Sequence, residues 1–61
     1  KLKALLRLLS EDEKELLRLR FTAELSFVQI GQLLGRSEEA VRKSIRRILD
    51  RLAVQMEAQH A

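Results

Sequence analysis

The spacing of hydrophobic residues along the chain predicts α-helices throughout. In the C-terminal third the apolar residues follow one another at steps of 4, 3, 1, 3 and 4, which is the period of one helix face. They fall within a wedge of about 100° and are Val41, Ile45, Ile48, Leu49, Leu52 and Met56. The opposite face carries Glu39, Ala40, Lys43, Arg46, Arg47 and Asp50. We therefore expect one long amphipathic helix from Glu38 to about Gln59.

Two serines mark the beginnings of two further helices. Ser10 is followed three residues later by Glu13, and Ser26 by Gln29, which is the spacing of a capping box. In this motif the serine oxygen accepts a hydrogen bond from a backbone amide, and the third residue reaches back to the serine amide. The helices predicted from these caps run over residues 11–21 and 27–34, with a loop over 22–25 between them.

The two glycines of the chain indicate a tight turn. Gly35 follows the helix over 27–34, at the left-handed position that glycine commonly occupies, and Ser37 begins the long helix two residues later. Gly31 lies inside the short helix, where glycine costs about 1 kcal/mol relative to alanine. A close approach of another backbone segment would justify that cost. The alternative is a solvent-exposed position at which the cost is tolerated.

The leucine-rich residues 2–9 predict one more short helix. The expected fold is therefore all-α, a small four-helix domain containing a helix-turn-helix, in a single domain over residues 1–61. Because Phe21 and Phe27 are the only aromatic residues, the core should consist of leucine, isoleucine and valine. The chain begins without methionine, in the middle of a pattern, and we expect it to be cut from a longer protein.

Composition and charge exclude several classes of function. The chain has no cysteine, which fits a reducing cytoplasm. It has no apolar run long enough to span a membrane, so we expect no membrane partner. Its one histidine, His60, lies beside the terminus, and no metal-ligand or nucleophile pattern is present, so we expect no enzyme, no cofactor and no small-molecule substrate. The net charge is +3, but residues 42–51 hold five basic side chains and one acidic one. That concentration favours a nucleic-acid partner.

The helix-turn-helix and the segment before it resemble region four of bacterial sigma factors, particularly those of the extracytoplasmic-function group. The resemblance covers about residues 4–53 and rests on Leu19-Arg20-Phe21, Leu25-Ser26-Phe27, Ile30-Gly31, Leu34-Gly35, Ser37, Val41-Arg42, Ile45, Arg47 and Leu52. The sequence departs from the family pattern at Val28-Gln29, Glu38-Glu39-Ala40 and Lys43-Ser44. These departures bear on the promoter sequence that is preferred more than on the fold.

The resemblance implies three partners. Region four binds double-stranded promoter DNA at the upstream −35 element, docks on the flap of the RNA polymerase β subunit, and is commonly sequestered by an anti-sigma protein. The function predicted in this way is promoter recognition during bacterial transcription initiation.

The exposed face of the long helix supplies the candidate DNA contacts. We predict that Glu39 and Lys43 read bases, since a carboxylate accepts from the amino group of cytosine and lysine donates to guanine. Two alternatives remain open: Glu39 serves only the helix dipole, and Lys43 contacts phosphate. Glu38 is expected toward the packed side, with a dipole role. The predicted phosphate contacts are Arg36, Ser37, Arg42, Arg46 and Arg47, whose alternative is an ordinary solvated surface.

Two other functions compete with this one. A response-regulator effector domain has a similar helix-turn-helix and dimerises through its last helix. A protein-interaction module would use apolar surface instead of DNA contacts, and the candidate residues for it are Leu2, Leu5, Leu6, Leu9, Val54 and Met56.

Overall fold

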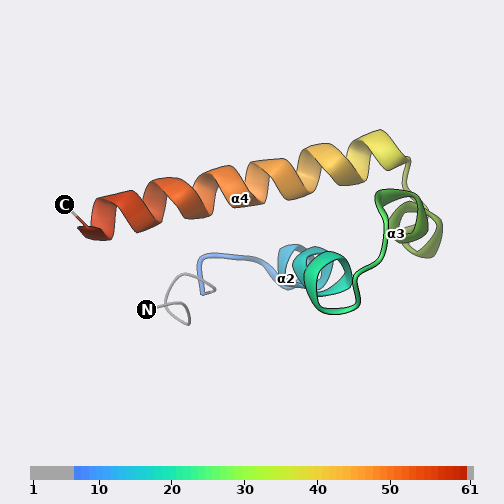
Figure 1. Cartoon of the computed structure of the whole chain (residues 1–61), viewed down its shortest axis with the longest axis horizontal. Coiled ribbons are helices and arrows are strands. Elements are labelled where there is room, and N and C mark those ends of the chain that lie inside the picture. The colour runs from blue at the N-terminus through green and yellow to red at the C-terminus, as the bar shows by residue number, and fades with distance from the viewer. Residues whose placement is uncertain (1–6, 61) are drawn as a thin grey trace.

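The computed structural model describes residues 7–60, with side chains described as far as Ala58. Along this part of the chain the elements are α2 (Glu11–Leu17), η1 (Arg18–Thr22), α3 (Phe27–Leu34) and α4 (Glu38–His60). Figure 1 shows α4 running the length of the molecule, with α2 beside it and α3 near its N-terminal end. Residues 7–60 contain no strand, which confirms the all-α prediction.

Along residues 7–60 the predicted count of four helices is not matched. Arg7, Leu8 and Leu9 form a turn and a bend, and residues 2–6 of the predicted helix lie outside the described residues. The local reason lies at Ser10, whose backbone is extended (φ −71°, ψ 167°), so that the chain changes direction there. Leu9 is consequently turned into the core, with 6% of its surface exposed.

The capping box predicted at Ser10 is confirmed. Ser10 Oγ accepts from the Glu13 amide at 3.2 Å, and the Ser10 amide donates to Glu13 Oε1 at 3.0 Å. After α2 the chain continues as a π-helical turn, η1, in which the Ala23 amide donates to the Arg18 carbonyl at 3.0 Å. The helical path therefore includes Thr22, one residue beyond the predicted end, and the loop is shorter than expected.

The predicted bounds of α3 and its cap are also confirmed. The Gln29 amide donates to Ser26 Oγ at 3.1 Å, and the Ser26 amide donates to Gln29 Oε1 at 2.8 Å. Gly35 adopts the left-handed conformation (φ 70°), which most side chains disfavour. The turn between α3 and α4 therefore has the geometry that the glycine predicts.

Gly31 is where the backbone of this turn returns against α3. A Cβ atom placed on Gly31 would lie 2.5 Å from the Arg36 carbonyl oxygen, and Gly31 is buried. The Gly31 carbonyl also accepts hydrogen bonds from the amides of Gly35 and Arg36. The close backbone approach is thus confirmed, and the solvent-exposed alternative is wrong.

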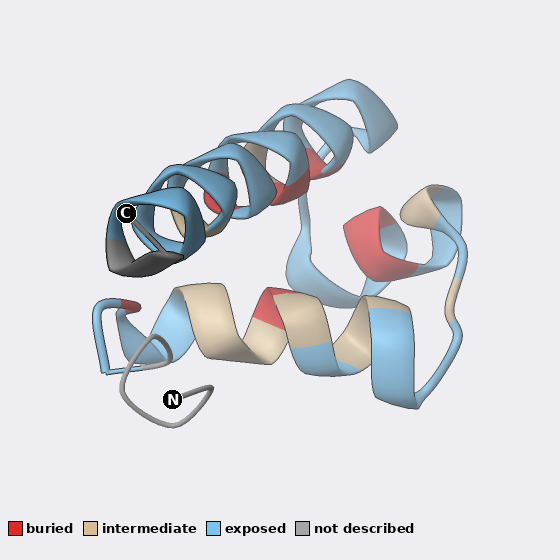
Figure 2. Ribbon diagram, turned by 60° about the vertical axis from the view of Figure 1, so that its left-hand side comes forward, coloured by how far each residue is buried: buried red, intermediate tan, exposed pale blue. Residues whose placement is uncertain are grey.

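The core is aliphatic, as the composition predicts. It joins α2, α3 and α4 through Leu9, Leu16, Ile30, Val41, Ile45 and Ile48. In Figure 2 the buried positions of α4 face α2 and α3, while most of its surface is exposed. Further along the apolar stripe Leu52 is half-buried, but Leu49 and Met56 are exposed. The stripe is therefore wider and longer than the surface that the other helices cover.

Two arginines tie the short helices to their neighbours. Arg20 donates to the Leu25 carbonyl at 2.9 Å, and its guanidinium carbon lies 4.5 Å from the centre of the Phe27 ring. Arg51 of α4 forms a two-point ion pair with Glu13, with both nitrogen–oxygen distances at 3.0 Å. Together these contacts hold α2 and the loop before α3 in place, and so brace the helix-turn-helix.

Candidate nucleic-acid interface

The N-terminal end of α4 emerges from the turn at Ser37. The Ser37 hydroxyl oxygen accepts from the Ala40 amide at 3.1 Å, and the Ser37 carbonyl accepts from the Val41 amide at 3.1 Å. The hydroxyl therefore caps the helix, as predicted, while its proton remains able to donate. Val41 is fully buried against the core, which anchors the start of α4 and turns its other face outward.

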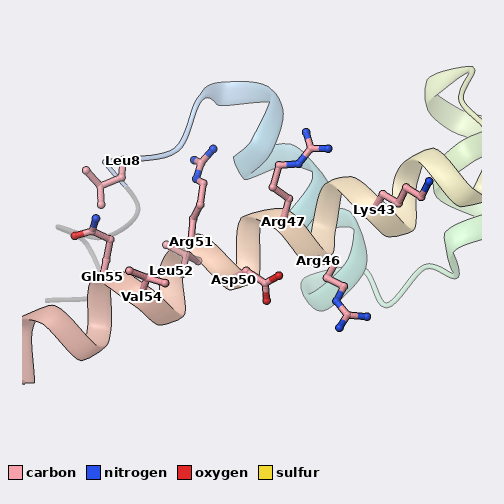
Figure 3. Close-up of a pocket in the computed structure, with 9 residues that line it drawn as sticks. All are labelled: Leu8, Lys43, Arg46, Arg47, Asp50, Arg51, Leu52, Val54 and Gln55. Carbon is pink, nitrogen blue, oxygen red and sulfur yellow. The ribbon is translucent and has the colours of Figure 1, made fainter.

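All seven predicted DNA contacts lie on the surface of this unit. Two come from the turn and five from the first half of α4: Arg36, Ser37, Glu39, Arg42, Lys43, Arg46 and Arg47. In Figure 3, Arg46 and Arg47 project from α4 in different directions, and Lys43 lies one turn closer to its start.

Carboxylates accompany the cations at the start of α4. Glu38 pairs with Arg42 at 3.2 Å, and Glu39 pairs with both Arg42 at 3.8 Å and Lys43 at 3.5 Å. The side chain of Glu38 is 50% exposed, so it lies less toward the packed side than its helical position suggested. Ion pairs this exposed contribute little to stability.

The remaining arginines of the interface are not paired in this way with carboxylates of the described residues. Within the described part of the chain, Arg36, Arg46 and Arg47 form no ion pair. Asp50 lines the same groove as Arg46 and Arg47 but forms no ion pair with them, so both guanidinium groups are available to a phosphate.

Sequence reasoning gave no role to Arg20, Arg51 or Glu13 as positioning residues. Arg20 stood within the motif that carried the family resemblance, and Arg51 within the basic run, but no local spacing joined them to their partners. The Ser10 amide, and after it the Arg51 guanidinium, hold the pKa of the Glu13 carboxyl below its ordinary value of 4.5. These residues help to fix α2 and the loop before α3 in place beside α4.

Two grooves flank α4. One has a volume of about 620 Å³ and combines apolar side chains with the cationic ones of Figure 3; it is lined by Leu8, Lys43, Arg46, Arg47, Asp50, Arg51, Leu52, Val54 and Gln55. The other has a volume of about 340 Å³ and is lined by Arg20, Phe21, Phe27, Arg42, Ile45, Arg46, Leu49 and Asp50. Phe21 and Val54 are both more than half exposed, so each groove offers apolar contact area beside positive charge.

The described part of the chain shows neither a metal site nor a membrane-spanning helix. The side chains of residues 7–58 include no group of three or more His, Cys, Asp or Glu arranged for a metal ion. None of the helices described is long and apolar enough to cross a membrane.

The comparison with protein families matches residues 5–53 to Sigma-70, region 4. The searches of curated proteins and of solved structures found no match. The matched residues include α2, η1, α3 and the half of α4 that carries the candidate contacts. The match favours the sigma resemblance over the response-regulator alternative. The chain therefore belongs to the sigma-70 region 4 family of DNA-binding helix-turn-helix domains.

Proposed function

We propose that the domain recognises the −35 element of bacterial promoters during transcription initiation, as part of a longer sigma factor of the extracytoplasmic-function group. The observation that carries the proposal is the exposed face of α4. It presents Lys43, Arg46 and Arg47 outward while Val41 and Ile45 hold the helix against α2 and α3. A helix braced in this way fits the major groove of DNA.

Glu39 and Lys43 are proposed as the base readers. They lie one turn apart on the exposed face, close to the end of the helix that enters the groove first. The carboxylate of Glu39 suits the amino group of cytosine, and the ammonium of Lys43 suits the O6 and N7 atoms of guanine.

Arg36, Arg42, Arg46 and Arg47 are proposed to contact phosphates, together with the Ser37 hydroxyl. Phosphate contacts set the register of the helix but carry little information on sequence. Each phosphate contact contributes about −0.9 to the slope of log K against log salt concentration, so four arginine contacts would give a slope no steeper than about −3.6.

A fluorescence anisotropy titration of labelled promoter duplexes at several salt concentrations tests the proposal. We expect Lys43→Ala to reduce the preference for the selected sequence and Arg47→Ala to weaken binding to all duplexes alike. Lys14→Ala is the matched control, because it removes a cation from α2, where Lys14 already pairs with Glu11 at 3.4 Å. Binding that does not depend on salt would refute the proposal.

Docking to the RNA polymerase β flap forms a second part of the proposal. The groove beside Phe21 and Leu49 is the favoured surface. Both are large apolar side chains that remain exposed, which is typical of a protein-binding surface. Leu49→Asp should weaken binding of the isolated flap domain in a pull-down. Its affinity for DNA should fall no more than the affinity of Val54→Asp for DNA. Val54→Asp introduces the same charge on the same helix but in the other groove, so equal flap binding by both variants would contradict this assignment.

An anti-sigma protein that covers either groove would compete with the flap or with DNA. We propose a cytoplasmic location for this chain, because promoter DNA and RNA polymerase are in the cytoplasm of bacteria. A role in protein interaction alone is the second candidate, because Val54 and Met56 are exposed on the part of α4 beyond the family match. A chain that binds a polymerase or anti-sigma partner but no duplex would favour that candidate.

A further inference from the structure

The start of α4 is electrically balanced, whereas the middle of the same helix is not. Residues 38–43 contain Glu38, Glu39, Arg42 and Lys43, which sum to zero. All four take part in the three ion pairs at 3.2, 3.8 and 3.5 Å. One turn later, Arg46 and Arg47 form no ion pair within the described residues.

Arg42 contacts both carboxylates and lies beside an aromatic ring. Carboxylates of Glu38 and Glu39 lie within 4 Å of its guanidinium, and the centre of the Phe27 ring lies 5.9 Å from its Cζ atom. A phosphate that binds Arg42 must therefore replace a carboxylate or share the guanidinium with it. The same holds for Lys43 and Glu39.

Fold stability does not account for this arrangement. The carboxylates of Glu38 and Glu39 are 50% and 63% exposed, and pairs of this kind add about 0–1 kcal/mol. Either carboxylate satisfies the helix dipole, and Ser37 already caps the helix. The pair also acts on an approaching duplex, because phosphates repel a carboxylate that has lost its partner.

We infer that Glu38 and Glu39 are built-in counter-ions: Glu38 weakens binding to DNA of every sequence, and Glu39 weakens binding mainly to DNA of the wrong sequence. The inference rests on the proposed function and adds a determinant of specificity to it. On any duplex, phosphates compete with the two carboxylates for Arg42 and Lys43. Only a duplex that offers a base amino group to Glu39 gives that carboxylate a new partner. Glu38 has no such compensation and weakens binding to every sequence.

Charge-neutral variants test this inference. Glu38→Gln, Glu39→Gln and the double variant keep the side-chain shape and remove the negative charge. Glu57→Gln is the matched control, because Glu57 lies on the same exposed helix, beyond the family match. The probes are a labelled duplex of about 20 base pairs with scrambled sequence, and one selected by the wild-type chain from a random pool. Far-UV circular dichroism verifies that each variant remains helical.

We expect each glutamine at 38 or 39 to tighten binding to the scrambled duplex about threefold or more relative to Glu57→Gln. The salt slope should steepen by up to about 0.9 for each carboxylate removed. Glu38→Gln should tighten binding to both duplexes alike. Glu39→Gln should tighten binding to the scrambled duplex more, and so lower the ratio of the affinity for the selected duplex to the affinity for the scrambled one.

Three outcomes separate this inference from the proposed function. If the wild-type chain binds duplexes but Glu38→Gln and Glu39→Gln match Glu57→Gln in affinity and slope, the inference is overturned and the proposed function stands. If only the double variant binds DNA, the suppression is real and stronger than expected. If neither the wild-type chain nor the double variant binds any duplex, both are overturned.

Discussion

Replacing Gly31 with alanine tests the packing of the turn against α3. The added Cβ would lie 2.5 Å from the Arg36 carbonyl oxygen, and real Cβ contacts essentially never fall below 3.0 Å. The turn must therefore move by at least 0.5 Å, the difference between the two distances. The obstacle is backbone, which is held by the hydrogen bond from the Arg36 amide to the Gly31 carbonyl at 2.8 Å.

Two opposing effects set the size of the change. Alanine gains about 1 kcal/mol over glycine within a helix. Overpacking that shifts the backbone costs about 1–3 kcal/mol. The net expectation is a loss of about 1 kcal/mol, which corresponds to about 4–8 °C in melting temperature for a domain of this size.

Thermal and urea unfolding followed by far-UV circular dichroism measure this change. We expect a lower midpoint with an unchanged m-value, because unfolding exposes the same surface area in both chains. Gln32→Ala is the control, since Gln32 is exposed on the same helix and its replacement should change stability by less than about 0.5 kcal/mol. A Gly31→Ala variant that melts several degrees above the wild type would show that helix propensity outweighs the contact, and would refute the reasoning.

Three further changes have expected outcomes. Gly35→Ala should lower the free energy of unfolding by about 1 kcal/mol through its positive φ alone, because no atom lies within 4 Å of the added Cβ; Gly35→Asn should recover part of the loss in the same urea titration. Ser26→Ala should cost about 1 kcal/mol by removing the cap, and an unchanged midpoint would contradict that role. The pKa of Glu13 is lowered in the folded chain, so its carboxylate stabilises the fold at pH values above the ordinary pKa of 4.5. This contribution is lost as the pH falls through the lowered pKa. The melting temperature of Glu13→Gln should therefore fall less with acidification, and parallel curves for the two chains would exclude the effect.

Local chemistry determined the features that were predicted correctly. Each capping box joins residues three positions apart, so Ser26 with Gln29 was sufficient to place the start of α3. Gly35 was sufficient to place its end, because the left-handed position follows the helix directly. The exposed face of α4 followed from its period, and with it the candidate contacts Glu39, Lys43 and Arg47, whose roles remain predictions.

The features that sequence reasoning missed involve segments distant along the chain. Glu13 and Arg51 are 38 positions apart, and no periodic pattern relates them. The turn at Arg7–Leu9 places Leu9 in a core that α2, α3 and α4 build together. Leucine content alone favoured a helix there because it reports hydrophobicity and not the direction in which the chain must turn.

By itself, the sequence determined the helical class, the caps, the glycine turn and the family motif, because each depends on residues within a few positions of one another. Only the tertiary structure decided which part of the apolar stripe of α4 is buried. Ile48 is covered and Leu49 is exposed, although both belong to the same stripe. Tertiary structure also decided that Gly31 meets the Arg36 carbonyl, and that Arg51 holds α2. Burial and backbone contact depend on which distant segments meet, and the period of a single helix does not contain that information.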